Sequence, residues 1–382
     1  MIGARIIYKS DPSCGRDQIN VTGAPYMKRH ILLACATLCG AASAQSSVTI
    51  YGIADVVLTR GNGSLSHKTA LASGGLQGSR VGFRGVEDLG GGLRASFNLE
   101  GQFFIDTGEG QASNSNNQTS GTTVAPAGTQ GFTFARRSTV SLDGAWGELR
   151  LGRDFSSQYR NRLEMDPFGS AGVGTIQPFV GSLGGPVSTR VSNMIGYYLP
   201  PNLGGFYGQF QHYRGENPSS QAVGDGTGSN FRLGYVWGPV NLSLSAARTD
   251  YTKTATTGDI LTQNVGVTYE AGPAKLLVGL FRDVVYRNVP LEGKGWTVGG
   301  IWNVGPGDVK FALSKYATDA TGNPEARKLS LGYVHNLSKR TALYGTIAQV
   351  SNAGGATFAL NGSTTAANTK SRGLDLGIRH SF

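Results

Sequence analysis

The sequence predicts an all-β protein, a 16-stranded antiparallel barrel that crosses a membrane. The chain holds 58 glycines and only 15% charged residues, a composition that argues against a helix-rich enzyme. No apolar run reaches the roughly 18 residues that a transmembrane helix needs. The segment 371–382 alternates strictly between polar residues and an apolar set, which consists of Leu374, Leu376, Ile378, His380 and Phe382. One apolar and one polar face are typical of a strand that separates lipid from a water-filled lumen.

The segment 27–44 has the three parts of a secretory signal. Lys28 and Arg29 are basic, residues 31–38 form an apolar run, and small residues end at Ala44. We therefore predict cleavage between Ala44 and Gln45, which leaves 45–382 as the barrel domain.

Residues 1–26 precede this signal and show no periodicity. We interpret them as a non-native upstream extension, with a disordered tail as the alternative. The three cysteines, Cys14, Cys35 and Cys39, all lie before the cleavage site, so the mature chain is predicted to be cysteine-free. Removing 1–44 leaves 29 basic and 22 acidic residues, a net charge of +7.

From Val48 onward, short alternating runs are separated by Gly, Asn, Ser, Asp and Pro, which is the pattern of many antiparallel strands. An even number of strands places both chain termini at the periplasmic rim. There the first and last strands can pair, and a closed ring leaves no unpaired strand edge in lipid. The sixteen predicted strands cover 46–60, 77–87, 92–105, 131–143, 147–156, 189–199, 204–213, 229–238, 240–251, 260–271, 274–287, 294–304, 308–318, 326–337, 341–351 and 371–382.

The connections between these strands alternate in length, which predicts the orientation of the barrel. Short turns belong on the periplasmic side, and long polar loops should face outward. The turns are predicted at 88–92, 144–146, 238–239, 272–273, 305–307 and 338–340, and the long loops at 61–76, 106–130, 214–228 and 352–370.

One long connection, 155–188, differs from the other loops in its apolar content. Its apolar residues are Met165, Phe168, Val173, Ile176, Phe179, Val180 and Leu183. A loop of this composition should pack against a surface, and the available surface is the inside of the barrel. We therefore predict that 155–188 folds inward and narrows the lumen.

Motifs of catalysis are weak. The triplet at 106–108 matches that of aspartic proteases, but it begins a polar loop and has no second copy. The five histidines show no metal-binding spacing, and the sequence contains no nucleophile elbow, phosphate loop or dinucleotide fingerprint. The net charge of +10 is spread through alternating strands rather than clustered as in nucleic-acid binders. We predict no enzyme activity, no cofactor and no nucleic-acid partner.

Several segments together resemble the Gram-negative trimeric general porins of the anion-preferring type. They are SRVGFRGVEDLGGGL at 79–93, FARRSTVSL at 134–142, GELRLGR at 147–153, the run 193–198 with Pro200, GYVHNLSKRT at 332–341 and GIRHSF at 377–382. The resemblance covers 46–382. It implies a homotrimer among the lipids of the cell outer membrane, with a third extracellular loop folded into a 16-stranded pore. It also implies that Phe382 ends a strand that the barrel-assembly machinery recognises.

The resemblance further implies that three wall arginines form the pore constriction. By local motif they are Arg80, Arg136 and Arg190. Arg80 and Arg190 lie on the polar parity of their strands. Alternation is ambiguous for Arg136, and Arg137 stays an alternative.

Acidic counterparts are predicted at Glu100, on the polar parity of its strand, and at Asp166, in the inward loop. Opposed rows of charge would create a transverse field that orients polar solutes. The predicted function is passive diffusion of ions and small hydrophilic solutes, with a preference for anions. The alternatives are a substrate-specific channel that uses Tyr159, Phe168 and Phe179 for a saturable site, and an outer-membrane hydrolase.

Overall fold

The computed structural model describes residues 47–112, 131–220 and 222–382. The predicted upstream extension, the signal segment and its cleavage site at Ala44 and Gln45 lie outside these residues and stay predictions. The part of the predicted loop 106–130 from 113 onward also lies outside them. None of the helices in the described part of the chain has the length and apolarity needed to cross a membrane.

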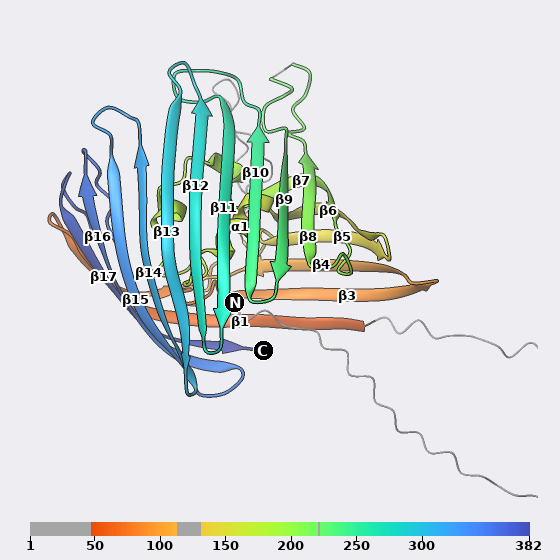
Figure 1. The fold of residues 1–382 in the computed structure, drawn as a ribbon, viewed down its shortest axis with the longest axis horizontal. Helices are drawn as coiled ribbons and strands as arrows, with labels where there is room; N and C mark the ends of the chain where they lie inside the picture. Colours follow the sequence, from red (N-terminus) through yellow and green to blue (C-terminus); the bar gives the residue numbers. More distant parts are fainter. Residues whose placement is uncertain (1–46, 113–130, 221) are drawn as a thin grey trace, which may run out of the picture. The chain divides into compact units, whose positions relative to one another are not determined.

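The described residues form one large antiparallel sheet of seventeen strands (Figure 1). Sixteen strands form a closed ring, because each pairs with its neighbours along the chain and the first also pairs with the last. The strands are β1 (Ser47–Asn62), β2 (His67–Ser73), β3 (Arg80–Gly90), β4 (Leu93–Gln102), β5 (Arg137–Gly144), β6 (Gly147–Phe155), β7 (Arg190–Tyr198), β8 (Phe206–Tyr213), β9 (Gly228–Trp237), β10 (Val240–Thr249), β11 (Asp259–Ala271), β12 (Ala274–Tyr286), β13 (Leu291–Val304), β14 (Gly307–Thr318), β15 (Glu325–Asn336), β16 (Thr341–Ala353) and β17 (Lys370–Ser381).

Strand β1 closes the ring. It pairs with β17 from Ile53 to Asn62 and with β3 from Ser47 to Ile53. The additional strand β2 pairs with β1 over the half that β3 does not reach. The prediction of a sixteen-stranded barrel is confirmed, whereas the segment 61–76, predicted as a loop, contains β2.

The start of β5 is the one large error in the predicted strand bounds. The prediction began at residue 131, but β5 begins at Arg137. Two aromatic residues just before β5 pack against other rings instead of pairing in a strand. The ring centroids of Phe132 and Phe134 lie 5.8 Å apart, and those of Phe134 and Phe83 lie 6.4 Å apart. Arg136 therefore precedes the regular ladder, and strand alternation does not govern its side chain.

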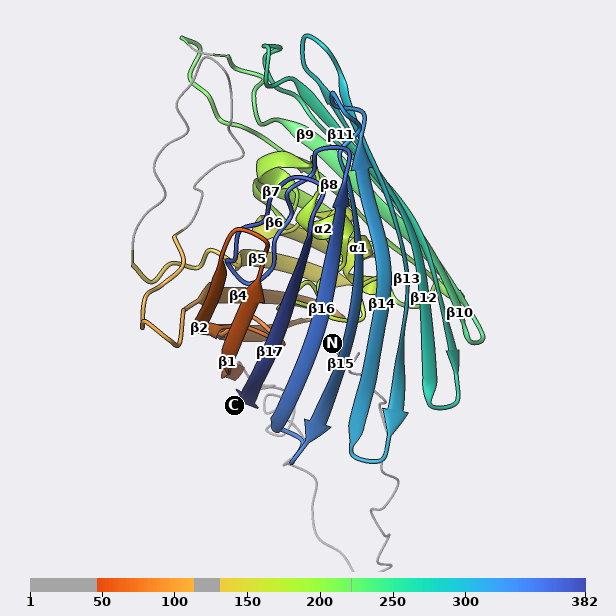
Figure 2. The same cartoon turned by 90° about the vertical axis from the view of Figure 1, so that its left-hand side faces the viewer.

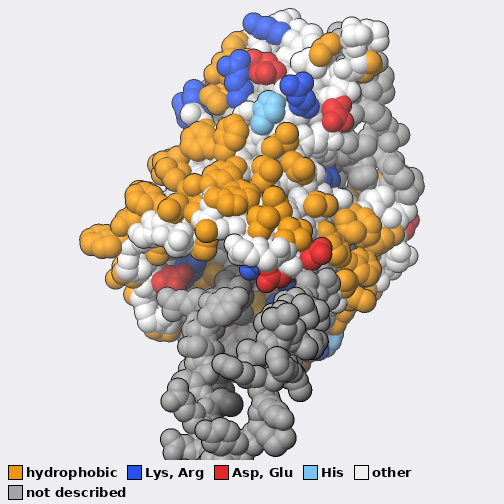
Figure 3. Space-filling view, turned by 90° about the vertical axis from the view of Figure 1, so that its right-hand side faces the viewer, with side chains coloured by type: hydrophobic (Ala, Val, Ile, Leu, Met, Phe, Trp, Pro, Cys, Tyr) orange, Lys and Arg blue, Asp and Glu red, His pale blue; other side chains and the backbone are white. Residues whose placement is uncertain are grey.

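Alternation within the strands separates an apolar outer face from a polar inner face. In β15, Leu329 and Leu331 are 59% and 49% exposed, whereas Lys328 and Ser330 are both 2% exposed. Figure 3 shows hydrophobic side chains gathered in a broad region of one face, with charged side chains mainly above it. Because the polar parity is the buried one, the apolar residues face the lipid, as expected of a membrane barrel.

The closing strand follows the predicted alternation. Leu376 and Ile378 are exposed on the outer face, and Asp375 is buried on the inner face. Phe382 extends the pairing by one residue, since its N–H donates to Gly52 at 3.0 Å and its carbonyl accepts from Gly52 at 2.9 Å. The role of Phe382 in assembly stays a prediction.

The long connection between β6 and β7 contains three short helices, α1 (Ser157–Glu164), α2 (Gln177–Val180) and the 3-10 helix η1 (Gly185–Val187). Helix α1 begins at its cap Ser156, whose hydroxyl accepts the Tyr159 N–H. Figure 2 shows α1 and α2 among the strands of the ring. Helix α1 contacts β8 to β11, and α2 contacts β13 to β15.

Polar contacts fix this connection to inward-facing wall residues. Asn161 donates to Asn264 at 2.6 Å, and the Gln177 N–H donates to Ser314 at 2.9 Å. Both partners are buried on the polar parity of their strands. The segment therefore packs against the inner face of the wall.

Two wall glycines make room for the connection. Met165 is fully buried against Gly266 of β11 and Gly279 of β12. A Cβ atom at Gly266 would overlap the Met165 sulfur. A larger residue at this position would displace the connection from the wall.

Candidate functional site: an arginine cluster on the inner wall

Neighbouring strands bring Arg80, Arg136 and Glu100 together on the inner wall. Arg136 Nε donates to Glu100 Oε1 at 2.6 Å, and Arg80 Nε lies 3.7 Å from Glu100 Oε2. Arg136 also donates to Gln102 at 2.8 Å. The three charged side chains are 10% to 18% exposed, so they are packed against the wall yet open to water.

Arg190 joins this group from the first position of β7. Its Nε donates to the backbone carbonyl of Arg136 at 2.9 Å, and its guanidinium lies 4.6 Å from the centre of the Phe155 ring. Among the described residues, Arg190 has no carboxylate at ion-pair distance, and Glu100 is the carboxylate paired with Arg80 and Arg136. We call Arg80, Arg136 and Arg190 the arginine cluster; Glu100 is the one carboxylate paired with two of its three cations.

Arg136 and Arg137 are the two candidates for the second arginine of the predicted constriction. Both lie on the inner side of the wall, but they contact different carboxylates. Arg136 contacts Glu100, whereas Arg137 Nε lies 3.5 Å from Asp154 Oδ2. Arg137 is the first residue of β5 and follows its inward parity, while Arg136 precedes the strand. The structure therefore places Arg136, the residue indicated by the motif, in the cluster and Arg137 beside a separate carboxylate.

Glu100 does not form a charge row opposite the arginines. Strand β4 lies between β3 and β5, so the inward Glu100 side chain is flanked by residues of those two neighbours. The hydroxyl of Tyr51 also donates to Glu100 at 3.1 Å. Glu100 lies within the basic wall and neutralises part of its charge, which corrects the predicted arrangement.

Asp166 is not brought to the arginine cluster either. Its carboxylate accepts the backbone N–H groups of Phe168 at 2.9 Å and Ser170 at 2.8 Å. Burial raises the pKa of Asp166 above its ordinary value. This residue stabilises a turn inside the connection, and such a role could not be read from its position in the sequence.

Two wall carboxylates that the prediction missed anchor the same connection. Asp283 accepts hydrogen bonds from Tyr316 at 2.6 Å, from Ser182 at 2.9 Å and from Arg162 at 3.3 Å. Asp375 accepts the Val173 N–H at 2.7 Å. Strand alternation predicts that both side chains point inward. It does not predict which groups they contact.

Arg153 is a further inward basic residue that the prediction missed. Its Nε donates to the carbonyl of Ala135 at 2.7 Å, and its guanidinium donates to the Ser192 hydroxyl at 2.6 Å. It thus contacts the backbone that carries Arg136. Alternation alone would give Arg153 the outward parity of Leu151, two residues earlier, and the register shift between Gly152 and Asp154 is what the sequence did not reveal.

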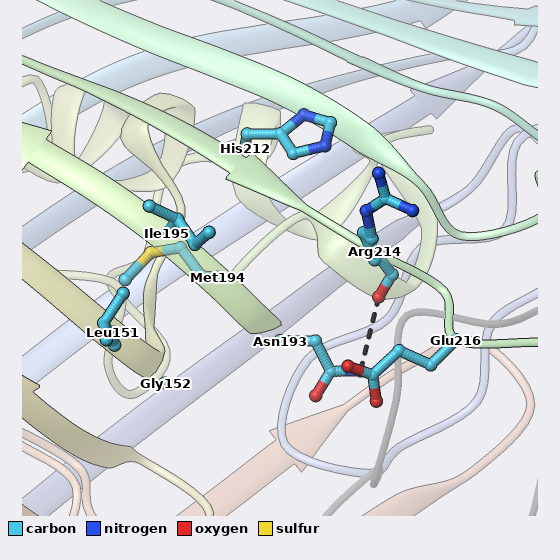
Figure 4. Close-up of a pocket in the computed structure, with 8 residues that line it drawn as sticks. All are labelled: Leu151, Gly152, Asn193, Met194, Ile195, His212, Arg214 and Glu216. Atoms are coloured by element: carbon cyan, nitrogen blue, oxygen red, sulfur yellow. Dashed lines mark hydrogen bonds between the residues drawn. The ribbon is translucent and has the colours of Figure 1, made fainter.

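The bulge between β6 and β7 also forms a cavity of about 340 Å³ on the outer side of the wall (Figure 4). Leu151 and Ile195 in its lining are exposed on the apolar face. Figure 4 shows Asn193 directed toward the backbone of Arg214, to which it donates at 3.3 Å. This cavity opens away from the lumen and is separate from the arginine cluster.

The chemistry of the arginine cluster suits anions. Guanidinium groups bind carboxylates and phosphates through charge-assisted hydrogen bonds. In residues 47–112, 131–220 and 222–382, no group of three or more His, Cys, Asp or Glu residues is placed to hold a metal ion. The described site therefore offers cationic groups on a wet surface.

Comparisons with known proteins agree on one family. A sequence profile described as Gram-negative porin matches residues 32–355. The chain is 36% identical to outer membrane porin protein 32 of Delftia acidovorans, with 93% of this chain and 99% of that one covered. It is 28% identical to an outer membrane porin protein of Bordetella pertussis, with 93% and 100% covered.

A solved structure agrees with the sequence matches. The anion-selective porin from Comamonas acidovorans superposes with a TM-score of 0.77 at 34% identity, covering 88% of this chain and all of that one. These relatives are channels rather than enzymes, and the closed ring with a polar inner face is the architecture of a channel. The chain is a channel protein of the Gram-negative outer membrane, and it belongs to the Gram-negative porin family.

Proposed function

We propose that the channel passes small hydrophilic solutes by diffusion and prefers anions, and that the arginine cluster sets this preference. The observation that carries the proposal is that Arg80 and Arg136 share the single carboxylate of Glu100, while Arg190 contacts the backbone carbonyl of Arg136 and has no ion pair among the described residues. An anion gains hydrogen bonds from the cluster, and a cation is repelled by its excess positive charge.

The magnitude of the effect follows from Coulomb's law. One unpaired charge at 4 Å is worth about 1 kcal/mol in bulk water and more beside a protein wall of lower permittivity. An excess of two charges is therefore enough to favour anions severalfold in the narrow part of a channel. The similarity to the anion-selective porin from Comamonas acidovorans supports the same assignment.

The test is the reversal potential of purified protein in a planar bilayer across a potassium chloride gradient. We expect the sign that corresponds to chloride preference, and Arg80→Ala together with Arg136→Ala should reduce this preference. Arg282→Ala is the matched control, since Arg282 is exposed on the outer face and pairs with Glu292. Cation preference in the unmodified channel would refute the proposal.

We further propose that the chain assembles as a homotrimer and is exported by the signal at 27–44. The family resemblance of 46–382 supports the trimer, and the basic and apolar pattern of 27–44 supports export. Chemical crosslinking and heat-dependent migration of the outer-membrane protein would reveal three subunits. A single band at the monomer mass under all conditions would contradict the trimer, and a mature protein that begins before Gln45 would contradict the cleavage site.

A further inference from the structure

An apolar and aromatic stripe of α1 remains open to water, beside Arg160 and Glu164, which pair with Asp154 and Arg232. Phe155, Tyr159 and Leu163 follow each other at intervals of four residues, so they share one side of the helix and its entrance. All three are partly exposed, whereas Gln158 and Asn161 are buried against the wall. The helix thus uses its polar side for anchoring and leaves its aromatic side open.

Three aromatic rings form a continuous surface on this side. Phe155 and Tyr159 stack with centroids 4.9 Å apart, and the Tyr159 ring meets Phe179 of α2 edge to face at 5.4 Å. We call Phe155, Tyr159 and Phe179 the aromatic face. Tyr159 and Phe179 are both partly exposed, so their rings are accessible.

The aromatic face adjoins the arginine cluster. Arg190 lies 4.6 Å from the centre of the Phe155 ring, which puts a cation of the cluster directly on the first ring. Cationic and aromatic groups therefore line one continuous site.

The two nearest carboxylates of the connection are directed elsewhere. Glu164 forms an ion pair with Arg232 and accepts from Tyr207 at 3.4 Å. Asp166 is buried in its own turn. Neither carboxylate therefore repels an anion from the aromatic face.

We propose that the arginine cluster and the aromatic face together bind aromatic carboxylates, and that Tyr159 and Phe179 determine this specificity. The solute carboxylate accepts hydrogen bonds from Arg80 and Arg136, and its ring packs on the two accessible aromatic rings. This inference rests on the proposed anion preference and adds a saturable preference for planar, ring-bearing anions. Aromatic contacts of this kind correspond to about a threefold to tenfold gain in affinity.

The experiment measures block of the chloride current by benzoate, by cyclohexanecarboxylate and by acetate in single channels. We expect benzoate to block at a concentration about threefold to tenfold lower than cyclohexanecarboxylate, which has a ring of similar size without a π face. In Tyr159→Leu with Phe179→Leu, the half-blocking concentration of benzoate should rise by a similar factor, while that of acetate stays unchanged. Equal block by the two ring compounds in the unmodified channel would overturn the inference.

Further variants separate the aromatic effect from misfolding. Phe210→Leu makes the same type of change on the outer face, where Phe210 is 51% exposed, and should leave benzoate block unchanged. Tyr159→Phe keeps the ring and should retain block, whereas Tyr159→Leu alone should weaken it. Identical block in these two Tyr159 variants overturns the inference.

The reversal potential measured on the same channels distinguishes the two proposals. Cation preference refutes the proposed function, and anion preference with benzoate block unaffected by the aromatic face refutes this inference alone.

Discussion

Carboxylates in two regions of the barrel interior, on β4 and on β12 with β17, have opposite roles. On the side of β3 to β7, Glu100 is partly exposed and pairs with two of the three clustered arginines. On the side of β12 to β17, Asp283 and Asp375 are 0% and 1% exposed and accept hydrogen bonds from the inward connection. Glu100 keeps its charge accessible to solutes, whereas Asp283 and Asp375 anchor the connection, as Asp154 of β6 also does through Arg160 of α1.

This difference shows why a count of charges along the chain does not give the field in the lumen. A carboxylate that accepts several hydrogen bonds is neutralised locally by the donors around it. Asp283 receives donors from Arg162, Ser182 and Tyr316, so little of its charge is available to a passing ion. Asp283 and Asp375 therefore contribute to the shape of the lumen, and we propose that the arginine cluster contributes to its selectivity.

Asp283→Ala should have the largest effect on this arrangement. It leaves Arg162, which is 2% exposed, as a buried cation without its carboxylate, at a cost of about 3 to 5 kcal/mol. We expect the barrel to insert but the connection to detach from the wall. Single-channel recordings should show a larger and noisier conductance, and trypsin should cut near Arg160 and Arg162.

The matched control is Asp250→Ala, because the Asp250 side chain is 52% exposed and directly follows β10. Its conductance should equal that of the unmodified channel. A quiet, normally sized conductance in Asp283→Ala would show that the other anchors suffice to hold the connection.

Glu100→Gln should sharpen the difference between the two sides. Loss of its charge leaves the arginine cluster with no paired anion, so anion preference should rise by a factor of about two to five, as expected for roughly 0.5 to 1 kcal/mol at a partly exposed site. Reversal potentials measure the change. Glu292→Gln, which removes a carboxylate from the outer face, should leave the reversal potential where it was, and a fall in anion preference in Glu100→Gln would contradict the prediction.

Arg136→Gln and Arg137→Gln test the assignment within the basic side. Arg136 pairs with the shared Glu100, whereas Arg137 lies beside Asp154, which also pairs with Arg150. Anion preference should fall by about twofold in Arg136→Gln and by less in Arg137→Gln. The reverse order in reversal-potential measurements would assign Arg137 to the selective group.

Asp166 should give the smallest effect, visible as a pH dependence. Burial raises its pKa above the ordinary value of 3.8, so the folded connection binds this proton more tightly than the unfolded one. The corresponding stability is fully present below the ordinary value and is lost as the pH rises through the raised pKa. Acidification from neutral pH should therefore protect the connection from proteolysis more in the unmodified protein than in Asp166→Asn. Parallel pH profiles of the two proteins would contradict this.

Strand alternation predicted much of the fold because it is a local property. In 371–382 the alternation of Leu376 and Ile378 with Asp375 follows from the period of two in a strand, and the structure confirms it. The same argument succeeded for Arg80, which lies beside Glu100 on the inner wall, but in β7 an irregularity interrupts the alternation and Val191, predicted to face lipid, is buried. Alternation was ambiguous for Arg136, which precedes the first residue of β5.

The sequence by itself determined the class of fold, the number of strands in the ring and the basic character of its inner wall. These follow from the alternation of side chains and from the turn residues, which act over a few positions. Only the tertiary structure decided which groups meet: Glu100 joins the arginines, Asp166 turns into its own loop, and Tyr159 packs between Phe155 and Phe179. The physical reason is that such pairings depend on strand register and on how one long connection packs across the barrel, and both involve residues far apart in the chain.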